Sequence, residues 1–101
     1  MKTLLMLYYM TQALLQSCYQ NNQQTTSLRL EVITTLRELD STILTGECPS
    51  KKIHPQVMHM LLDAYYQRLL NCKKEEVAHY ARQLEEQLEI ILTYDMEITR
   101  G

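Results

Sequence analysis

The fold is decided by residues 28–46, which read LRLEVITTLRELDSTILTG. The apolar residues of this stretch recur at steps of four, four, three and four, which keeps them on one face of a helix with 3.6 residues per turn. Gly46 follows where a helix can end in the left-handed conformation. The pattern predicts an amphipathic helix over residues 27–45, with Thr26 or Ser27 as its N-cap. Its expected inner face is Leu28, Val32, Leu36, Leu39 and Ile43, with Ile33 and Leu44 beside them.

Similar spacing predicts three more helices, over residues 3–19, 55–70 and 74–93. The first carries apolar residues around much of its circumference, so we expect it to be buried. Pro55 suits the first turn of the third helix, where its missing N–H has no helical partner. The expected inner face of helix 3–19 is Leu4, Leu7, Ala13 and Leu14, with Leu5, Tyr8, Met10 and Leu15 beside them. That of helix 55–70 is Met58, Leu61, Leu62, Tyr65 and Leu69, with Tyr66 and Leu70 beside them. That of helix 74–93 is Val77, Tyr80, Ala81, Leu84, Leu88 and Ile91.

The junction at residues 71–74 is compatible with two structures. Asn71 can cap a new helix, and Glu75 and Glu76 would favour the positive end of that helix. The alternative is one long bent helix over residues 55–93. We favour a break, because two helices joined by a tight turn can bury their apolar stripes against each other.

The composition supports the same fold. A chain of 101 residues is one domain by size, and two glycines and two prolines are too few for the many turns of a β-rich domain. The sequence therefore predicts a single all-α domain over residues 1–101, an antiparallel up-down four-helix bundle. Residues 94–101 lose the hydrophobic period, so we expect a tail there that frays or folds back.

The N-terminal segment has some features of a lipoprotein signal. It begins with a lysine and an apolar run, and residues 15–18 read LQSC. Tyr8, Tyr9 and Gln12 interrupt the run, which is also too short and polar to span a bilayer. We therefore interpret this segment as the first helix of the bundle, without stable membrane insertion.

No motif for catalysis, cofactor binding or metal binding is found. His54 and His59 are five residues apart, which places them on different helix faces, and Cys48 could join them around zinc only without the usual paired spacing. A single Glu76/His79 pair falls short of a di-metal carboxylate site, which needs two such pairs. We expect no metal, no cofactor and no enzyme activity. The three cysteines, Cys18, Cys48 and Cys72, are expected to be free and mostly buried thiols.

Nucleic-acid binding is disfavoured by charge. The net charge is −2, and the basic residues do not form a basic face or half. The pairs Lys51-Lys52 and Lys73-Lys74 are best explained as solvated loops or helix ends.

The layout resembles the immunity proteins of pediocin-like bacteriocins, the enterocin A immunity group. The resemblance lies in LRELD at 36–40, ILTG at 43–46, the lysine-bearing loop and the paired helices from Pro55 to Leu92. The apolar start of this chain departs from that family. The resemblance implies a cytoplasmic protein that can associate with the inner membrane face and acts on a membrane sugar-transporter receptor with its bound bacteriocin.

In that family the C-terminal half decides which bacteriocin is countered. The resemblance thus implies that recognition in this chain lies in the helix from Glu75 to Leu92 and the tail from Tyr94 to Gly101. An alternative from another class is a small helical adaptor or secretion chaperone that binds a partner helix in a groove. The tail residues expected to bind the partner are Tyr94, Asp95, Met96, Glu97, Ile98 and Arg100.

Overall fold

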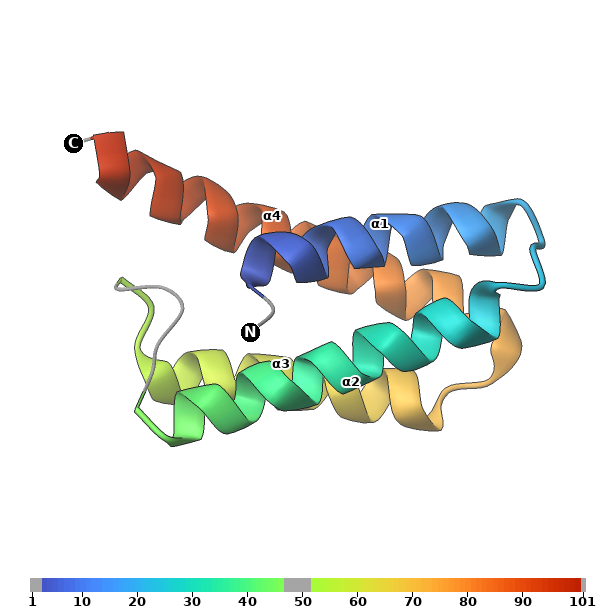
Figure 1. Ribbon diagram of the computed structural model, residues 1–101, viewed down its shortest axis with the longest axis horizontal. Coiled ribbons are helices and arrows are strands. Elements are labelled where there is room, and N and C mark those ends of the chain that lie inside the picture. Colours follow the sequence, from blue (N-terminus) through green and yellow to red (C-terminus); the bar gives the residue numbers. More distant parts are fainter. Residues whose placement is uncertain (1–2, 47–51, 101) are drawn as a thin grey trace.

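The computed structural model describes residues 3–46 and 52–100, with side chains described as far as Tyr94. Within these residues the chain forms four α-helices and one short 3-10 turn, and it contains no strand (Figure 1). The all-α four-helix bundle predicted from the sequence is therefore confirmed. The elements are α1 (Leu4–Tyr19), α2 (Thr25–Leu44), α3 (Pro55–Asn71), η1 (Lys74–Glu76) and α4 (Val77–Arg100).

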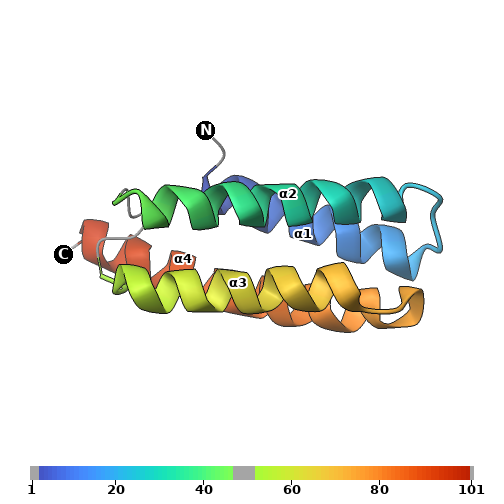
Figure 2. The ribbon, with the colours of Figure 1, turned by 90° about the horizontal axis from the view of Figure 1, so that it is seen from below.

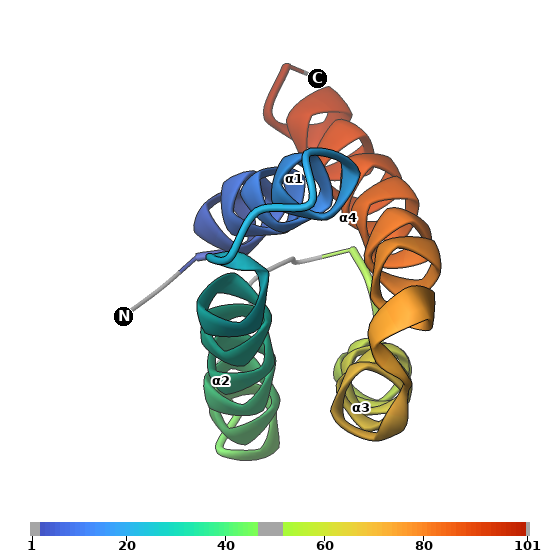
Figure 3. The ribbon, with the colours of Figure 1, turned by 90° about the vertical axis from the view of Figure 1, so that its right-hand side faces the viewer.

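The helices run alternately up and down in two layers. Helix α1 lies beside α4 in one layer, and α2 lies beside α3 in the other (Figures 2 and 3). The molecule measures 41 × 27 × 21 Å. Between the layers lies a core made almost wholly of leucine and other aliphatic residues. The core residues are Leu4, Leu7, Leu14, Leu15, Val32, Ile33, Leu36, Leu39, Ile43, Met58, Leu62, Tyr65, Leu69, Val77, Ala81, Leu84, Leu88 and Ile91.

Local sequence signals set several helix ends. The Thr3 hydroxyl accepts a hydrogen bond from the backbone N–H of Met6, which caps α1. Gly46 has a φ of +98° just after α2, which is the left-handed conformation expected of it. Pro55 occupies the first turn of α3, as predicted. The chain breaks at residues 72–73, so the alternative of one long bent helix is wrong.

The start of α2 differs from the prediction. Neither Thr26 nor Ser27 is its N-cap, because the helix begins earlier, at Thr25. The turn before it is instead built around Asn22, whose side-chain oxygen accepts from the Gln24 backbone N–H at 3.0 Å. Such a local bond from an asparagine side chain stabilises a turn without capping the helix.

Helix α1 is less buried than its composition suggested. Its inner face is buried, but Ala13 is exposed, and so are Leu5, Met6 and Tyr9 on the outer side. A helix in a four-helix bundle has only two neighbours and one core-facing stripe, so its outer residues meet solvent whatever their hydrophobicity. Leu44 and Leu70, expected beside the core, are 68% and 45% exposed for the same reason.

Helix α4 is longer than predicted. The expected tail over residues 94–101 is helical as far as Arg100, and this end extends past the start of α1 (Figure 1). Extending an existing helix adds one hydrogen bond for each residue fixed, so a segment without Gly or Pro can continue it even where no apolar stripe is packed.

A polar seam joins α2 to α3. The Arg29 guanidinium donates to the carbonyl oxygens of Leu69 at 2.8 Å and of Cys72 at 3.0 Å, at the C-terminal end of α3. Farther along, Arg37 donates to the Tyr66 hydroxyl and lies over its ring. The Asp40 carboxylate pairs with His59. We call these three contacts the α2–α3 seam.

Core truncation should be costly at two positions. Leu36 and Leu84 are both fully buried, so replacing either by Ala should lower the free energy of unfolding by about 2–4 kcal/mol. Leu30, which is 63% exposed, is the matched control, and Leu30→Ala should change it by less than about 0.5 kcal/mol. Urea unfolding followed by circular dichroism measures all three. Equal losses for all three would contradict the assigned faces.

Removing the Arg29 contacts should also destabilise the bundle. Arg29→Met keeps much of the side-chain stem but leaves the terminal carbonyls of α3 without their charged donor. We expect a loss of about 1–2 kcal/mol in urea unfolding. The control is Arg82→Met, which removes an exposed ion pair with Glu86 at 3.7 Å. It should lower the free energy of unfolding by about 0.3 kcal/mol. A loss at Arg29 no larger than at Arg82 would show that the seam adds nothing to stability.

Candidate partner-binding groove

The α3–α4 side of the bundle is more open than the α2–α3 side. Among the described residues, no side-chain hydrogen bond or ion pair joins α3 to α4, whereas the α2–α3 seam has three such contacts. The C-terminal part of α4 also runs away from α3 (Figure 1). The space between them is therefore the place where a third body could contact both helices.

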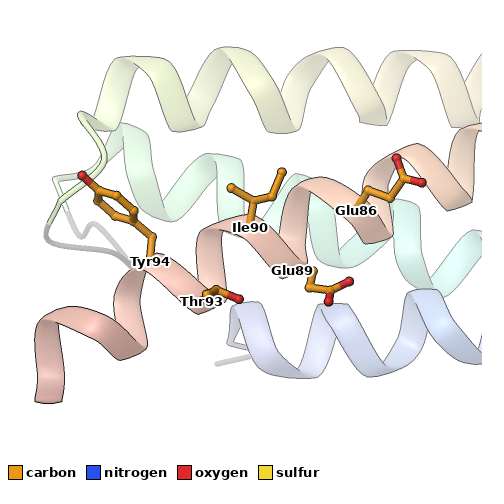
Figure 4. Close-up of a pocket in the computed structure, with 5 residues that line it drawn as sticks. All are labelled: Glu86, Glu89, Ile90, Thr93 and Tyr94. Carbon is orange, nitrogen blue, oxygen red and sulfur yellow. The ribbon is translucent and has the colours of Figure 1, made fainter.

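A groove of about 540 Å³ lies along this part of α4 (Figure 4). Glu86, Ile90 and Tyr94 follow one another at steps of four, so they share one face of the helix. Figure 4 shows the three side chains along the same side of α4. We call this space the α4 groove, and the residues that line it are Glu86, Glu89, Ile90, Thr93 and Tyr94.

Two large apolar side chains in the α4 groove are open to solvent. Ile90 is 61% exposed and Tyr94 is 49% exposed. A single exposed apolar residue is ordinary on a protein surface, but two that line the same hollow form a place that a partner can cover. The α4 groove therefore has the apolar floor that helix-in-groove recognition requires.

Helix α3 presents an apolar flank on the same side. His59 and Tyr66 point toward α2, since both contact that helix. Val57 and Leu61 are each two residues from His59, and at about 100° per residue they lie on the opposite flank of α3. Val57 is 56% exposed and Leu61 is half-buried. In its first two turns the side of α3 away from the seam thus carries two apolar side chains, and the exposed Arg68 follows on that side farther along the helix.

The charges around the α4 groove follow an order. The two carboxylates that line it, Glu86 and Glu89, are both exposed. At one end Lys52 lies over the Tyr94 ring, with its Nζ 5.4 Å from the ring centroid. One turn beyond the other end, Arg82 pairs with Glu86 at 3.7 Å. The groove is therefore acidic from its Glu86 end to Glu89, with Lys52 at its Tyr94 end and Arg82 one turn beyond Glu86.

The sequence prediction of the partner-binding residues overlaps this groove at one position. Tyr94 lines the α4 groove, as a member of the predicted set. Asp95, Met96, Glu97, Ile98 and Arg100 continue α4, and their side chains lie outside the described residues. Sequence reasoning missed Ile90. Its signal was an isoleucine on the polar side of the helix, next to the buried Ile91, where the amphipathic pattern calls for a polar residue.

The histidines are held in separate local contacts. The His54 ring accepts a hydrogen bond from the Gln56 backbone N–H at 3.2 Å and caps α3. His59 belongs to the α2–α3 seam, and the His79 ring packs on that of Tyr80 at 5.3 Å. Among the described residues no group of three His, Cys, Asp or Glu side chains could hold a metal ion. Cys48 lies outside those residues.

Cys18 and Cys72 are free and partly buried. Burial raises the pKa of the Cys18 thiol, the nearby Arg29 guanidinium opposes this shift, and the Cys72 thiol adds to it. Burial likewise raises the pKa of the Cys72 thiol against the influence of Arg29. A raised pKa leaves less of the nucleophilic thiolate at neutral pH, so these thiols are suited to packing rather than to catalysis.

Two other hollows are less suited to docking. A space of about 700 Å³ between α1 and α4 is bordered mostly by polar side chains, among them Gln12, Gln16, Arg82 and Glu85. A smaller one of about 290 Å³ between α2 and α3 carries Leu30 and Leu70 but lies beside the closed seam. The α4 groove combines exposed apolar side chains with an open flank, so it is our candidate site.

Comparison with known proteins gives no relative. No family model matches the chain, and no curated protein or solved structure matches it. In the part of the chain that the structure describes, no helix has the length and hydropathy needed to cross a membrane. The role of the α4 groove must therefore be inferred from its own residues.

Proposed function

We propose that this protein is a non-catalytic binding module that takes up a helical segment of a partner protein in the α4 groove. The observation that carries the proposal is the pair of exposed apolar side chains, Ile90 and Tyr94, in one hollow beside the apolar flank of α3. Helix-in-groove binding needs apolar anchors on one helix face and walls that accept the partner's side chains. The α4 groove supplies the apolar anchors through Ile90 and Tyr94, and all of its described lining residues belong to α4.

The energetics support docking at this place. Covering a side chain the size of Ile90 or Tyr94 contributes about 1–3 kcal/mol, since each is about half exposed in the free protein. Interfaces commonly draw most of their affinity from a few such anchors, and tyrosine is a preferred one. Because the rest of the bundle is already packed, binding here needs little rearrangement of the core.

Photo-crosslinking in the producing cells tests the binding role directly. A photoreactive phenylalanine analogue at position 90 should give a covalent adduct of higher mass on illumination. The matched control is the same analogue at position 30, because Leu30 is 63% exposed on α2 and Ile90 is 61% exposed on α4. Mass spectrometry of the purified protein reads out both. If position 90 gives no more adduct than position 30, the α4 groove is not the binding site.

The resemblance favours one narrower role, that of a bacteriocin immunity protein. In this role the partner is the membrane sugar-transporter receptor with its bound bacteriocin, and the protein works in the cytoplasm at the inner membrane face. The resemblance alone supports this part of the proposal. The α4 groove is compatible with it, because the groove lies in the C-terminal half to which the family assigns recognition. An adaptor or secretion chaperone would use the same groove for a different partner helix.

Expression in a sensitive strain tests the immunity role. The protein should raise the concentration of at least one pediocin-like peptide that is needed to stop growth. Ile90→Glu should remove this protection, because a charge would be placed at the groove floor, while Leu30→Glu on α2 should retain it. Replacement of residues 94–101 should alter or abolish it. Strains that stay fully sensitive across a panel of such peptides would favour the adaptor role instead.

A further inference from the structure

We infer that the partner segment is a basic amphipathic helix, with an apolar stripe against Ile90 and Tyr94 and lysine or arginine residues against Glu86 and Glu89. This inference rests on the proposed function and specifies the chemistry of the partner. It follows from the placement of charges around the α4 groove.

Among the described residues, the lining of the α4 groove contains two carboxylates and no cation. Among the described residues, Glu89 has no ion pair, and the pair between Glu86 and Arg82 is long and exposed on both sides. Exposed ion pairs of this kind contribute little, so Glu86 is free to exchange Arg82 for a partner's cation. A basic residue of the partner placed opposite Glu86 and Glu89 would therefore contact both carboxylates and displace no strong contact.

The two ends of the groove limit where the partner's charges can lie. Lys52 at the Tyr94 end and Arg82 beyond the Glu86 end would repel a helix that is basic along its whole length. A complementary helix is therefore basic opposite Glu86 and Glu89, and neutral or acidic toward its ends. From position 86 to position 94 the groove measures about 12 Å at 1.5 Å per residue, which equals roughly two turns of a bound helix.

The same charges disfavour the other occupants. A two-fold dimer whose symmetry axis passes beside Glu86 and Glu89 would bring these carboxylates against their own copies. Like charges brought together across an interface oppose association. An anionic lipid surface would meet the same repulsion from these carboxylates. A basic helix is the occupant that turns both glutamates into favourable contacts.

Two synthetic helices test the inference by titration calorimetry against the whole protein. Both have about 18 residues, roughly five turns, with the same leucine stripe at i, i+4, i+7 and i+11. One carries lysines at the central polar positions and the other carries glutamates there. The lysine helix should bind at least about tenfold more tightly than the glutamate helix. Added salt should reduce this difference, since the groove carboxylates are exposed.

Charge reversal provides the decisive variant. In the double variant Glu86→Lys/Glu89→Lys, the preference should invert toward the glutamate helix. The matched control is Glu31→Lys/Glu38→Lys, which makes the same charge change at exposed positions of α2 and should keep the preference for lysine. Circular dichroism should show equal helix content in both, because all four side chains are exposed.

Several results would overturn the inference. For the unaltered protein, they are equal binding of the two helices, no binding of the lysine helix, or tighter binding to anionic phosphatidylglycerol vesicles than to the lysine helix. For the Glu86→Lys/Glu89→Lys variant, the contradicting result is a preference for the lysine helix that persists. A protein that crosslinks through position 90 in cells but gives one of these results would retain the proposed function and lose only the basic-helix inference. Absence of the crosslink would remove the proposed function itself.

Discussion

The arrangement of this bundle depends on the contact between Arg29 and the end of α3. A helix leaves its last carbonyl groups without internal partners, and here a guanidinium from α2 supplies donors to two residues at that point. The planar fork of an arginine can serve several acceptors at once, which a lysine cannot do in the same way. This contact supplies donors to the last carbonyls of α3 and links α2 to that end of the helix, next to the turn that leads into α4.

The closure of the α2–α3 side explains the opening of the α3–α4 side. Arg37 and Asp40 continue the seam along α2 and hold Tyr66 and His59 on one flank of α3. On the opposite flank the start of α3 carries Val57 and Leu61, and no described polar contact joins α3 to α4. Because α4 packs its buried stripe mainly against α1, Ile90 and Tyr94 face a space that the described residues leave open. The α4 groove is the result.

The residues that line the α4 groove determine which contacts a partner can make there. Among the described residues, the α4 groove combines two exposed apolar side chains, two carboxylates and the hydroxyls of Thr93 and Tyr94, and no metal-binding cluster is found there. The two described thiols, Cys18 and Cys72, lie at the end of the bundle where α1 meets the α3–α4 turn, and burial raises the pKa of each.

The helical pattern of the sequence was sufficient for the fold and for most of the core. Stripes such as Val32, Leu36 and Leu39, the stop at Gly46 and the proline at the start of α3 all act within one or two turns, so they can be read locally. Leu5, Leu44 and Leu70 could not be placed in this way, because each is apolar and near a stripe, and only the positions of the neighbouring helices leave it exposed. The same holds for Ile90. Its periodicity marks it as off the core stripe, but the choice between an isolated surface residue and a groove floor depends on α3 diverging from α4. The course of α4 relative to α3 is set by contacts between residues far apart in the chain, such as those between α1 and α4, and no spacing along one helix encodes them.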